Sequence, residues 1–109
     1  MPDLHLTKIK CFETESVMGA DKLRIQFKSA YSDDPDWQIG TGIGSMNTGD
    51  VKDLSLSLLF RKEIKLRLVD VDAFDDWDVL GEVTIRGGKG THSFTWDGAH
   101  YKLWYHVTH

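Results

Sequence analysis

The stretch LVDVDAFDDWDVLGEV, from Leu68 to Val83, decides how this chain is read. Five aspartates fall within nine residues, from Asp70 to Asp78, and apolar residues flank them on both sides. Up to Leu68 the apolar residues alternate with charged ones, and a second apolar segment begins at Val79. Because alternation with period two is typical of a half-buried strand, the stretch predicts a strand, an acidic loop and a second strand.

The same alternation recurs along the whole chain, interrupted by turn signals rich in glycine, proline and aspartate. Between Leu6 and Ile9 the alternation slips by one residue, which predicts a β-bulge. The pattern predicts an all-β protein, with one eight-stranded antiparallel β-sandwich domain over residues 1–109. The expected strands are 4–12, 21–29, 36–41, 54–60, 63–70, 79–86, 90–96 and 99–108.

Acidic residues are unevenly divided between the two ends of this predicted sandwich. In an antiparallel succession alternate loops lie at the same end, which brings together loops 13–20, 42–53, 70–78 and 97–98. That end carries eleven of the seventeen acids: Glu13, Glu15, Asp21, Asp50, Asp53, Asp70, Asp72, Asp75, Asp76, Asp78 and Asp97. Loops distant in sequence are therefore expected to bring carboxylates to one place.

Composition narrows the classes of partner and compartment. The formal net charge of −4 gives no electrostatic reason to expect a nucleic-acid partner. Cys11 is the only cysteine, so no internal disulfide is possible, which fits a reducing, cytoplasmic location. No signal peptide and no transmembrane segment are expected, because no apolar run is long enough. Cys11 alternates with Ile9, which favours a buried structural thiol over a nucleophile.

Converging carboxylates favour a hard cation. Like charges held close repel one another unless they are solvated, protonated or bound to a cation, and calcium takes six to eight oxygen ligands. Asp70 and Asp72 share a face at the end of a strand, and Asp78 returns the chain to the next strand. An EF-hand is excluded, because positions 5, 6 and 12 of such a loop would be Phe74, Asp75 and Gly81.

The segment VDVDAFDDWDVLGEV resembles the third calcium loop of C2 domains, the calcium- and lipid-binding β-sandwiches. That pattern is a strand, Asp-x-Asp, a short loop, and Asp-x-apolar-Gly before the next strand; it places Asp70, Asp72, Asp78 and Gly81. The segment LTKIKCFETESVMGADKLRIQF is similar to the first strand, first calcium loop and second strand of the family, and Asp21 matches the aspartate that closes that loop. The predicted loop order corresponds to the permuted, second topology of the family.

The resemblance implies a Ca²⁺ site formed by Asp21, Asp70, Asp72 and Asp78. The family usually has an aspartate early in the first loop, where this chain offers Glu13 followed by Thr14. Asp75 and Asp76 are expected to face solvent. Loop 42–53 contains three glycines but lacks the lysine of a phosphate-binding loop, so it is expected to be a second loop at the calcium end that contributes Asp50 or backbone carbonyls.

Two aromatic residues of the acidic loop are candidates for membrane contact, because aromatic rings favour the headgroup interface. Phe74 lies in the middle of the loop, and Trp77 either dips into a membrane or folds back over the base of the loop. Basic residues on outward strand faces either form a patch for anionic headgroups or are ordinary solvated positions: Arg24, Lys28, Lys65 and Arg67.

The sequence therefore predicts a non-enzymatic, calcium-dependent binding module for anionic phospholipid surfaces, cytoplasmic and peripheral to membranes. The alternative is a protein-interaction or targeting sandwich of the same fold without calcium or lipid activity. A hydrolase has little support, although glycosidases also use paired carboxylates.

Overall fold

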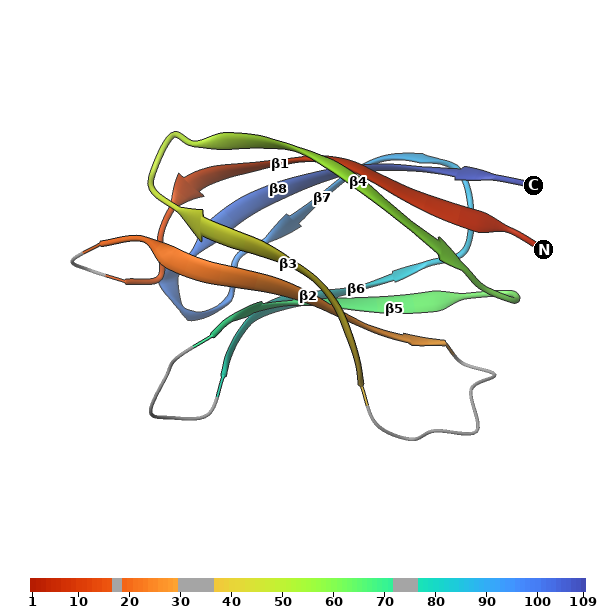
Figure 1. The fold of residues 1–109 in the computed structure, drawn as a ribbon, viewed down its shortest axis with the longest axis horizontal. Coiled ribbons are helices and arrows are strands. Elements are labelled where there is room, and N and C mark those ends of the chain that lie inside the picture. Colours follow the sequence, from red (N-terminus) through yellow and green to blue (C-terminus); the bar gives the residue numbers. More distant parts are fainter. Residues whose placement is uncertain (17–18, 30–36, 72–76) are drawn as a thin grey trace.

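Eight antiparallel strands form almost all of the structure, a computed structural model that describes residues 1–16, 19–29, 37–71 and 77–109 (Figure 1). The all-β prediction is confirmed. One short 3-10 helix, η1 (Trp96–Gly98), lies between the last two strands. The strands are β1 (Asp3–Glu13), β2 (Asp21–Ser29), β3 (Gln38–Met46), β4 (Val51–Leu59), β5 (Ile64–Asp70), β6 (Asp78–Ile85), β7 (Lys89–Phe94) and β8 (His100–Thr108).

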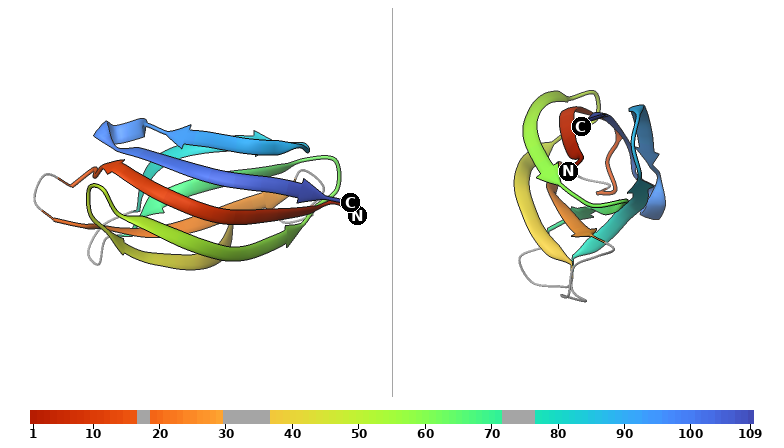
Figure 2. Two further views of the ribbon diagram at one scale, coloured as in Figure 1. Left: turned by 90° about the horizontal axis from the view of Figure 1, so that it is seen from above. Right: turned by 90° about the vertical axis from the view of Figure 1, so that its right-hand side faces the viewer.

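The strands form two four-stranded sheets that pack face to face (Figure 2). One sheet has the order β4-β1-β8-β7 and the other has the order β3-β2-β5-β6. Alternate residues of the central strands point between the sheets, as period-two patterning requires. The core contains Leu4, Leu6, Ile9, Cys11, Leu23, Ile25, Ile64, Leu66, Leu68, Leu80, Phe94, Tyr101 and Leu103, all buried.

The predicted bulge in the first strand is confirmed. The pairing of β1 with both β4 and β8 shifts register between Leu6 and Lys8. One extra residue there returns Ile9 to the inner face after Leu6, so both side chains are buried. A slip of one residue without this bulge would turn the rest of β1 outward.

Residues 42–53 were predicted to form a loop, and that prediction is wrong for most of the segment. Strand β3 continues to Met46 and β4 already begins at Val51. The glycines serve close packing of backbones instead of a turn: a Cβ on Gly40 would lie 2.6 Å from the Ile25 carbonyl oxygen. Register shifts between β2 and β3 accompany this segment, and glycine tolerates such irregular pairing.

Gly81 has a comparable packing role in β6. It has a φ of 155°, and a Cβ there would lie 2.7 Å from the Phe94 Cδ1 and 3.0 Å from its Cα. The pairing of β5 with β6 also shifts register between Leu68 and Val69, opposite this part of β6. The glycine of the acidic stretch therefore lets β6 approach β7 of the other sheet.

The two chain ends lie together at one end of the sandwich, as Figure 1 shows. The opposite end is called the acidic end here; it carries the connections from β1 to β2, from β3 to β4, from β5 to β6 and from β7 to β8. Antiparallel pairing places Glu13, Asp21, Asp70 and Asp78 there, because each is a strand terminus at that end. Backbone hydrogen bonds from Gly49 N–H to the Cys11 carbonyl and from Cys11 N–H to the Asp50 carbonyl close the β3–β4 turn against β1.

Candidate metal centre

Two aspartates face each other where β5 ends and β6 begins. Asp70 is the last residue of β5, Asp78 is the first residue of β6, and the two are register partners. The Asp70 carboxylate accepts a hydrogen bond of 2.9 Å from the Lys22 backbone N–H of β2. Like charges directly opposite on neighbouring strands destabilise a sheet, so this pair is unfavourable unless positive charge or a proton compensates.

A third carboxylate comes from the connection between β1 and β2. Carboxylate oxygens of Glu15, Asp70 and Asp78 all lie within 4.8 Å of one another, and these three residues are called the acidic cluster below. Asp78 is exposed, whereas Glu15 and Asp70 are half-buried. The cluster is therefore open to solvent on one side and supported by the sandwich on the other.

The proton affinities of the acidic cluster reflect this crowding. Desolvation raises the pKa of Glu15 to about 7, helped by its hydrogen bond with Asp70 and by the negative charges of Asp78, Asp70 and Asp97. Desolvation also raises the pKa of Asp70, against the opposing effect of the hydrogen bonds from Lys22 N–H and Glu15. A shared proton between Glu15 and Asp70 therefore relieves part of the repulsion in the absence of a cation.

The acidic cluster fits a hard divalent cation. All of its donors are carboxylate oxygens, which suit calcium and magnesium and offer no preference for softer metals. Calcium accepts an irregular shell of six to eight oxygens, whereas magnesium requires a tight octahedron. Because the donors come from a loop and two strand ends and one of them is exposed, calcium suits this arrangement better.

The residues predicted from the sequence divide into several groups. The structure brings Asp70 and Asp78 together, as predicted. Glu13 is exposed at the end of β1, in register with His100, and does not belong to the acidic cluster. Asp72, together with Phe74, lies outside the described residues. Glu15, counted among the acids but not selected as a ligand, takes the place that was expected for Glu13.

Asp21 has different surroundings from the acidic cluster. Its side chain is fully buried, and both of its carboxylate oxygens accept hydrogen bonds, from Glu15 N–H, Ser16 N–H and the Tyr101 hydroxyl. Asp50 likewise accepts a backbone hydrogen bond, from Asn47 N–H at 2.8 Å, and this bond shapes the β3–β4 turn.

Trp77 lies half-buried at the start of β6. The Arg24 guanidinium stands 5.5 Å from its ring centroid, so the indole packs toward the outer face of β2. A second pair of this kind lies on the same sheet, where Arg67 stands 4.2 Å from the Trp37 ring and also binds Glu82. Aromatic rings thus accompany two of the four outward basic residues.

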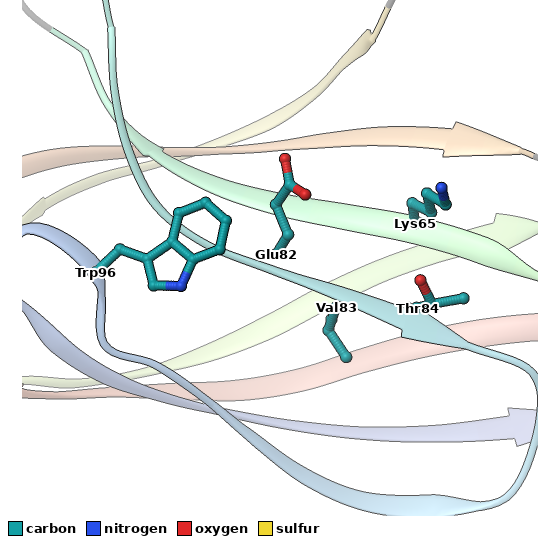
Figure 3. Close-up of a pocket in the computed structure, with 5 residues that line it drawn as sticks. All are labelled: Lys65, Glu82, Val83, Thr84 and Trp96. Carbon is teal, nitrogen blue, oxygen red and sulfur yellow. The ribbon is translucent and has the colours of Figure 1, made fainter.

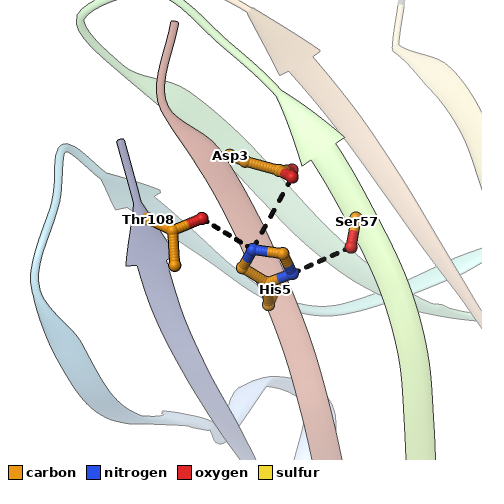
Figure 4. Close-up of polar contacts among 4 residues, drawn as sticks. All are labelled: Asp3, His5, Ser57 and Thr108. Atoms are coloured by element: carbon orange, nitrogen blue, oxygen red, sulfur yellow. Dashed lines mark hydrogen bonds and ion pairs between the residues drawn. The ribbon is translucent and has the colours of Figure 1, made fainter.

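Two further groupings of polar side chains lie away from the acidic cluster. Trp96 of η1 and Glu82 of β6 border a pocket of about 290 Å³, together with Lys65, Val83 and Thr84 (Figure 3). On the other sheet His5 bonds Ser57 through Nδ1 at 2.9 Å and Thr108 through Nε2 at 2.8 Å (Figure 4). Asp3 lies 3.6 Å from the same Nε2, and because Thr108 takes that nitrogen, the group ties β4, β1 and β8 together without the order of a catalytic triad.

Without calcium, the free energy of unfolding should depend on Glu15 between about pH 5 and pH 8. The folded-state pKa of Glu15 is about 7 and its ordinary value is 4.5. The native state therefore holds an extra proton in this range, so the contribution of Glu15 is fully present below the ordinary value and is lost as the pH rises through about 7. Urea unfolding in chelator at several pH values measures this slope.

Glu15→Gln is the control for this prediction, since glutamine keeps a hydrogen-bond donor toward Asp70 but does not titrate. Desolvation lowers the pKa of His92, which gives the opposite slope at acid pH in both proteins. The difference between wild type and Glu15→Gln therefore isolates Glu15. Parallel pH profiles for the two proteins would show that this carboxyl titrates normally.

Comparisons with known proteins agree on the fold. No family model and no curated protein matches the sequence. The first C2 domain, domain A, of a plant extended synaptotagmin 1 matches the structure with a TM-score of 0.60 and 9% identity, over 97% of this chain and 90% of that chain. A structure described as a C2 domain matches with a TM-score of 0.59 and 15% identity, over 99% of this chain and 97% of that chain.

The fold is also similar to part of an enzyme. Human GIVD cytosolic phospholipase A2 matches with a TM-score of 0.62 and 8% identity, over 97% of this chain but only 16% of the enzyme chain. At these identities the matches concern the fold. Two sheets of the observed strand order, matched over nearly the whole length of two C2 structures, show that this chain has the fold of a C2 domain.

Proposed function

We propose that this protein is a calcium-dependent module that binds anionic phospholipid surfaces. The observation that carries the proposal is the acidic cluster, three carboxylates from two separate connections held within 4.8 Å of one another. The C2 fold supports it, because this arrangement lies at the end of the sandwich where the resemblance of the sequence to C2 domains implies calcium ligands.

In this proposal Glu15, Asp70 and Asp78 hold the cation, and Asp72, outside the described residues, adds a fourth carboxylate. The Lys22 N–H keeps the Asp70 carboxylate in place before a cation arrives, at 2.9 Å. Asp78 is exposed and leaves the outer side of the acidic cluster accessible to a headgroup. Bound calcium would supply the positive charge that neutralises these carboxylates and attracts anionic headgroups.

Aromatic and basic residues beside the acidic cluster extend the proposed contact. Phe74 lies in the acidic loop and is proposed to enter the interface. Trp77 is the second proposed membrane residue, with Arg24 over its ring. Arg24 itself is one of the outward cations of its sheet, which suits a surface of negative headgroups.

A second function is a protein-interaction or targeting module that needs no calcium. The hydrogen bond between Glu15 and Asp70 favours this alternative, because it relieves repulsion in the acidic cluster without a cation. The two functions differ in their response to calcium, and a titration distinguishes them.

Both functions describe binding without catalysis, in the cytoplasm and peripheral to membranes. The free, buried thiol of Cys11 suits a reducing compartment. Within the described ranges, no helix has the length and apolar character needed to cross a membrane.

Phe74→Ala should weaken binding to vesicles of anionic phospholipid without weakening calcium binding. Burial of an aromatic ring in the interface contributes about 1–3 kcal/mol, so the affinity for vesicles should fall by about tenfold or more. Sedimentation of vesicles with calcium and with chelator measures this. Leu59→Ala, which truncates an exposed apolar residue at the opposite end, is the matched control. Equal sedimentation of wild type with calcium and with chelator would contradict the proposed function.

A further inference from the structure

One buried carboxylate supports the acidic cluster from below. Asp21 is 0% exposed and is the only buried charged side chain in the described part of the chain. Burying a carboxylate is strongly unfavourable unless hydrogen bonds replace its water. The interactions of this side chain therefore determine whether the first connection folds as observed.

Three donors surround Asp21. The Glu15 N–H donates to Oδ2 at 2.8 Å and the Ser16 N–H donates to Oδ1 at 3.0 Å. The Tyr101 hydroxyl donates to Oδ2 at 2.5 Å. Two of the three donors are thus consecutive backbone amides of the β1–β2 connection, and one of them belongs to Glu15 itself.

Tyr101 connects Asp21 to the opposite sheet. It is fully buried in β8, whereas Asp21 begins β2 of the other sheet. Cys11 is its register partner on β1, and the Cys11 thiol bonds the same hydroxyl. Because its single hydroxyl proton goes to Asp21, the tyrosine oxygen accepts from the thiol. A ring packed in the core cannot follow a moving loop, so this bond gives Asp21 a fixed position.

We infer that Asp21 is the buried anchor of the first connection and not a metal ligand, and that Tyr101 is a positioning residue that acts through Asp21 to present Glu15 to Asp70 and Asp78. The resemblance to C2 domains implied a ligand at Asp21. In this chain both of its oxygens are committed to protein donors, and the adjacent Glu15 reaches the acidic cluster. The part of the inference that concerns metal binding rests on the proposed function.

Tyr101→Phe tests the anchor, because it removes one oxygen and keeps the ring. In calcium-free protein, amide hydrogen exchange at Glu15 and Ser16 should accelerate by about tenfold or more, since a hydrogen bond to a charged group is lost. Amides of β5 and β6 should keep their protection. Tyr105→Phe is the matched control, because it removes a tyrosine hydroxyl from the same strand without touching Asp21. Unchanged exchange at Glu15 and Ser16 in Tyr101→Phe would overturn the anchor.

Calorimetric titration with calcium, well below the unfolding temperature of both variants, tests the positioning role. The Kd of Tyr101→Phe should rise by about tenfold, as expected for the loss of one charge-assisted hydrogen bond. A hydroxyl that only stabilised the fold would leave the Kd of the folded protein unchanged, which would overturn the positioning role. The exchange measurement needs no calcium, so it decides on the anchor even if wild type binds none and the proposed function fails.

Asp21→Asn separates an anchor from a ligand. If Asp21 is the anchor, this variant loses protection at Glu15 and Ser16 in the absence of calcium, because an amide group cannot accept from all three donors. If Asp21 is a ligand, exchange in the calcium-free protein stays as in wild type and only calcium binding is lost. The second result would overturn the inference, and a double-mutant cycle with Tyr101→Phe checks that the two side chains act together.

Discussion

Replacing Asp70 by asparagine should remove most of the calcium affinity and leave the fold intact. Asp70 is the residue that the acidic cluster is built around, since it pairs with Asp78 across the strands and hydrogen-bonds with Glu15. Unit charges about 4 Å apart near a protein surface interact by about 4 kcal/mol. Half of that energy already corresponds to more than about a tenfold loss of affinity.

The same substitution should not destabilise the calcium-free protein. Asparagine keeps an oxygen that accepts the Lys22 N–H, and it removes one charge from a repelling group. Thermal unfolding with calcium and with chelator measures both effects. Glu63→Gln is the control, because Glu63 lies at the opposite end and makes only an exposed ion pair with Arg86. An equal calcium-induced shift in Asp70→Asn and wild type would mean that the cation binds elsewhere.

Gly81→Ala should destabilise the protein by about 2–4 kcal/mol, the combined effect of overpacking and an unfavourable backbone conformation. A methyl group there would lie 2.7 Å from the Phe94 ring and 3.0 Å from the Phe94 Cα. The ring atom could turn away, but the backbone of β7 could not move without separating it from β8.

Gly87→Ala is the matched control, since a Cβ at Gly87 would meet nothing within 4 Å. It should change the free energy of unfolding by less than about 0.5 kcal/mol. Urea unfolding of the three proteins makes the comparison. Similar stabilities of Gly81→Ala and Gly87→Ala would show that β6 and β7 are not in close contact.

Much of the fold could be predicted from the sequence, because side-chain alternation directly reports which face of a strand is buried. The slip between Leu6 and Ile9 revealed the bulge in β1 for the same reason. The error came at β3, where glycine has no side chain to alternate. There the strand depends on close contact of backbones, as at Gly40 against the Ile25 carbonyl, and such contact leaves no periodic signal.

The candidate metal site could be predicted only in part. Asp70 and Asp78 end and begin paired strands, so their proximity follows from strand order alone. Glu15 belongs to a connection, where the backbone path is set by bonds to Asp21 and not by periodicity. The sequence could not show that β1 continues through Glu13, which leaves that residue in the strand and lets the next acid reach the acidic cluster.

Calorimetric titration of the calcium-free protein with calcium is the most direct test of the proposed function. We predict saturable binding, with magnesium weaker because of its stricter geometry. We also predict stabilisation of about 2.7 kcal/mol when calcium exceeds its Kd about a hundredfold. No heat of binding, together with an unchanged melting curve in millimolar calcium, would contradict the account and leave a C2-fold module that acts without this cation.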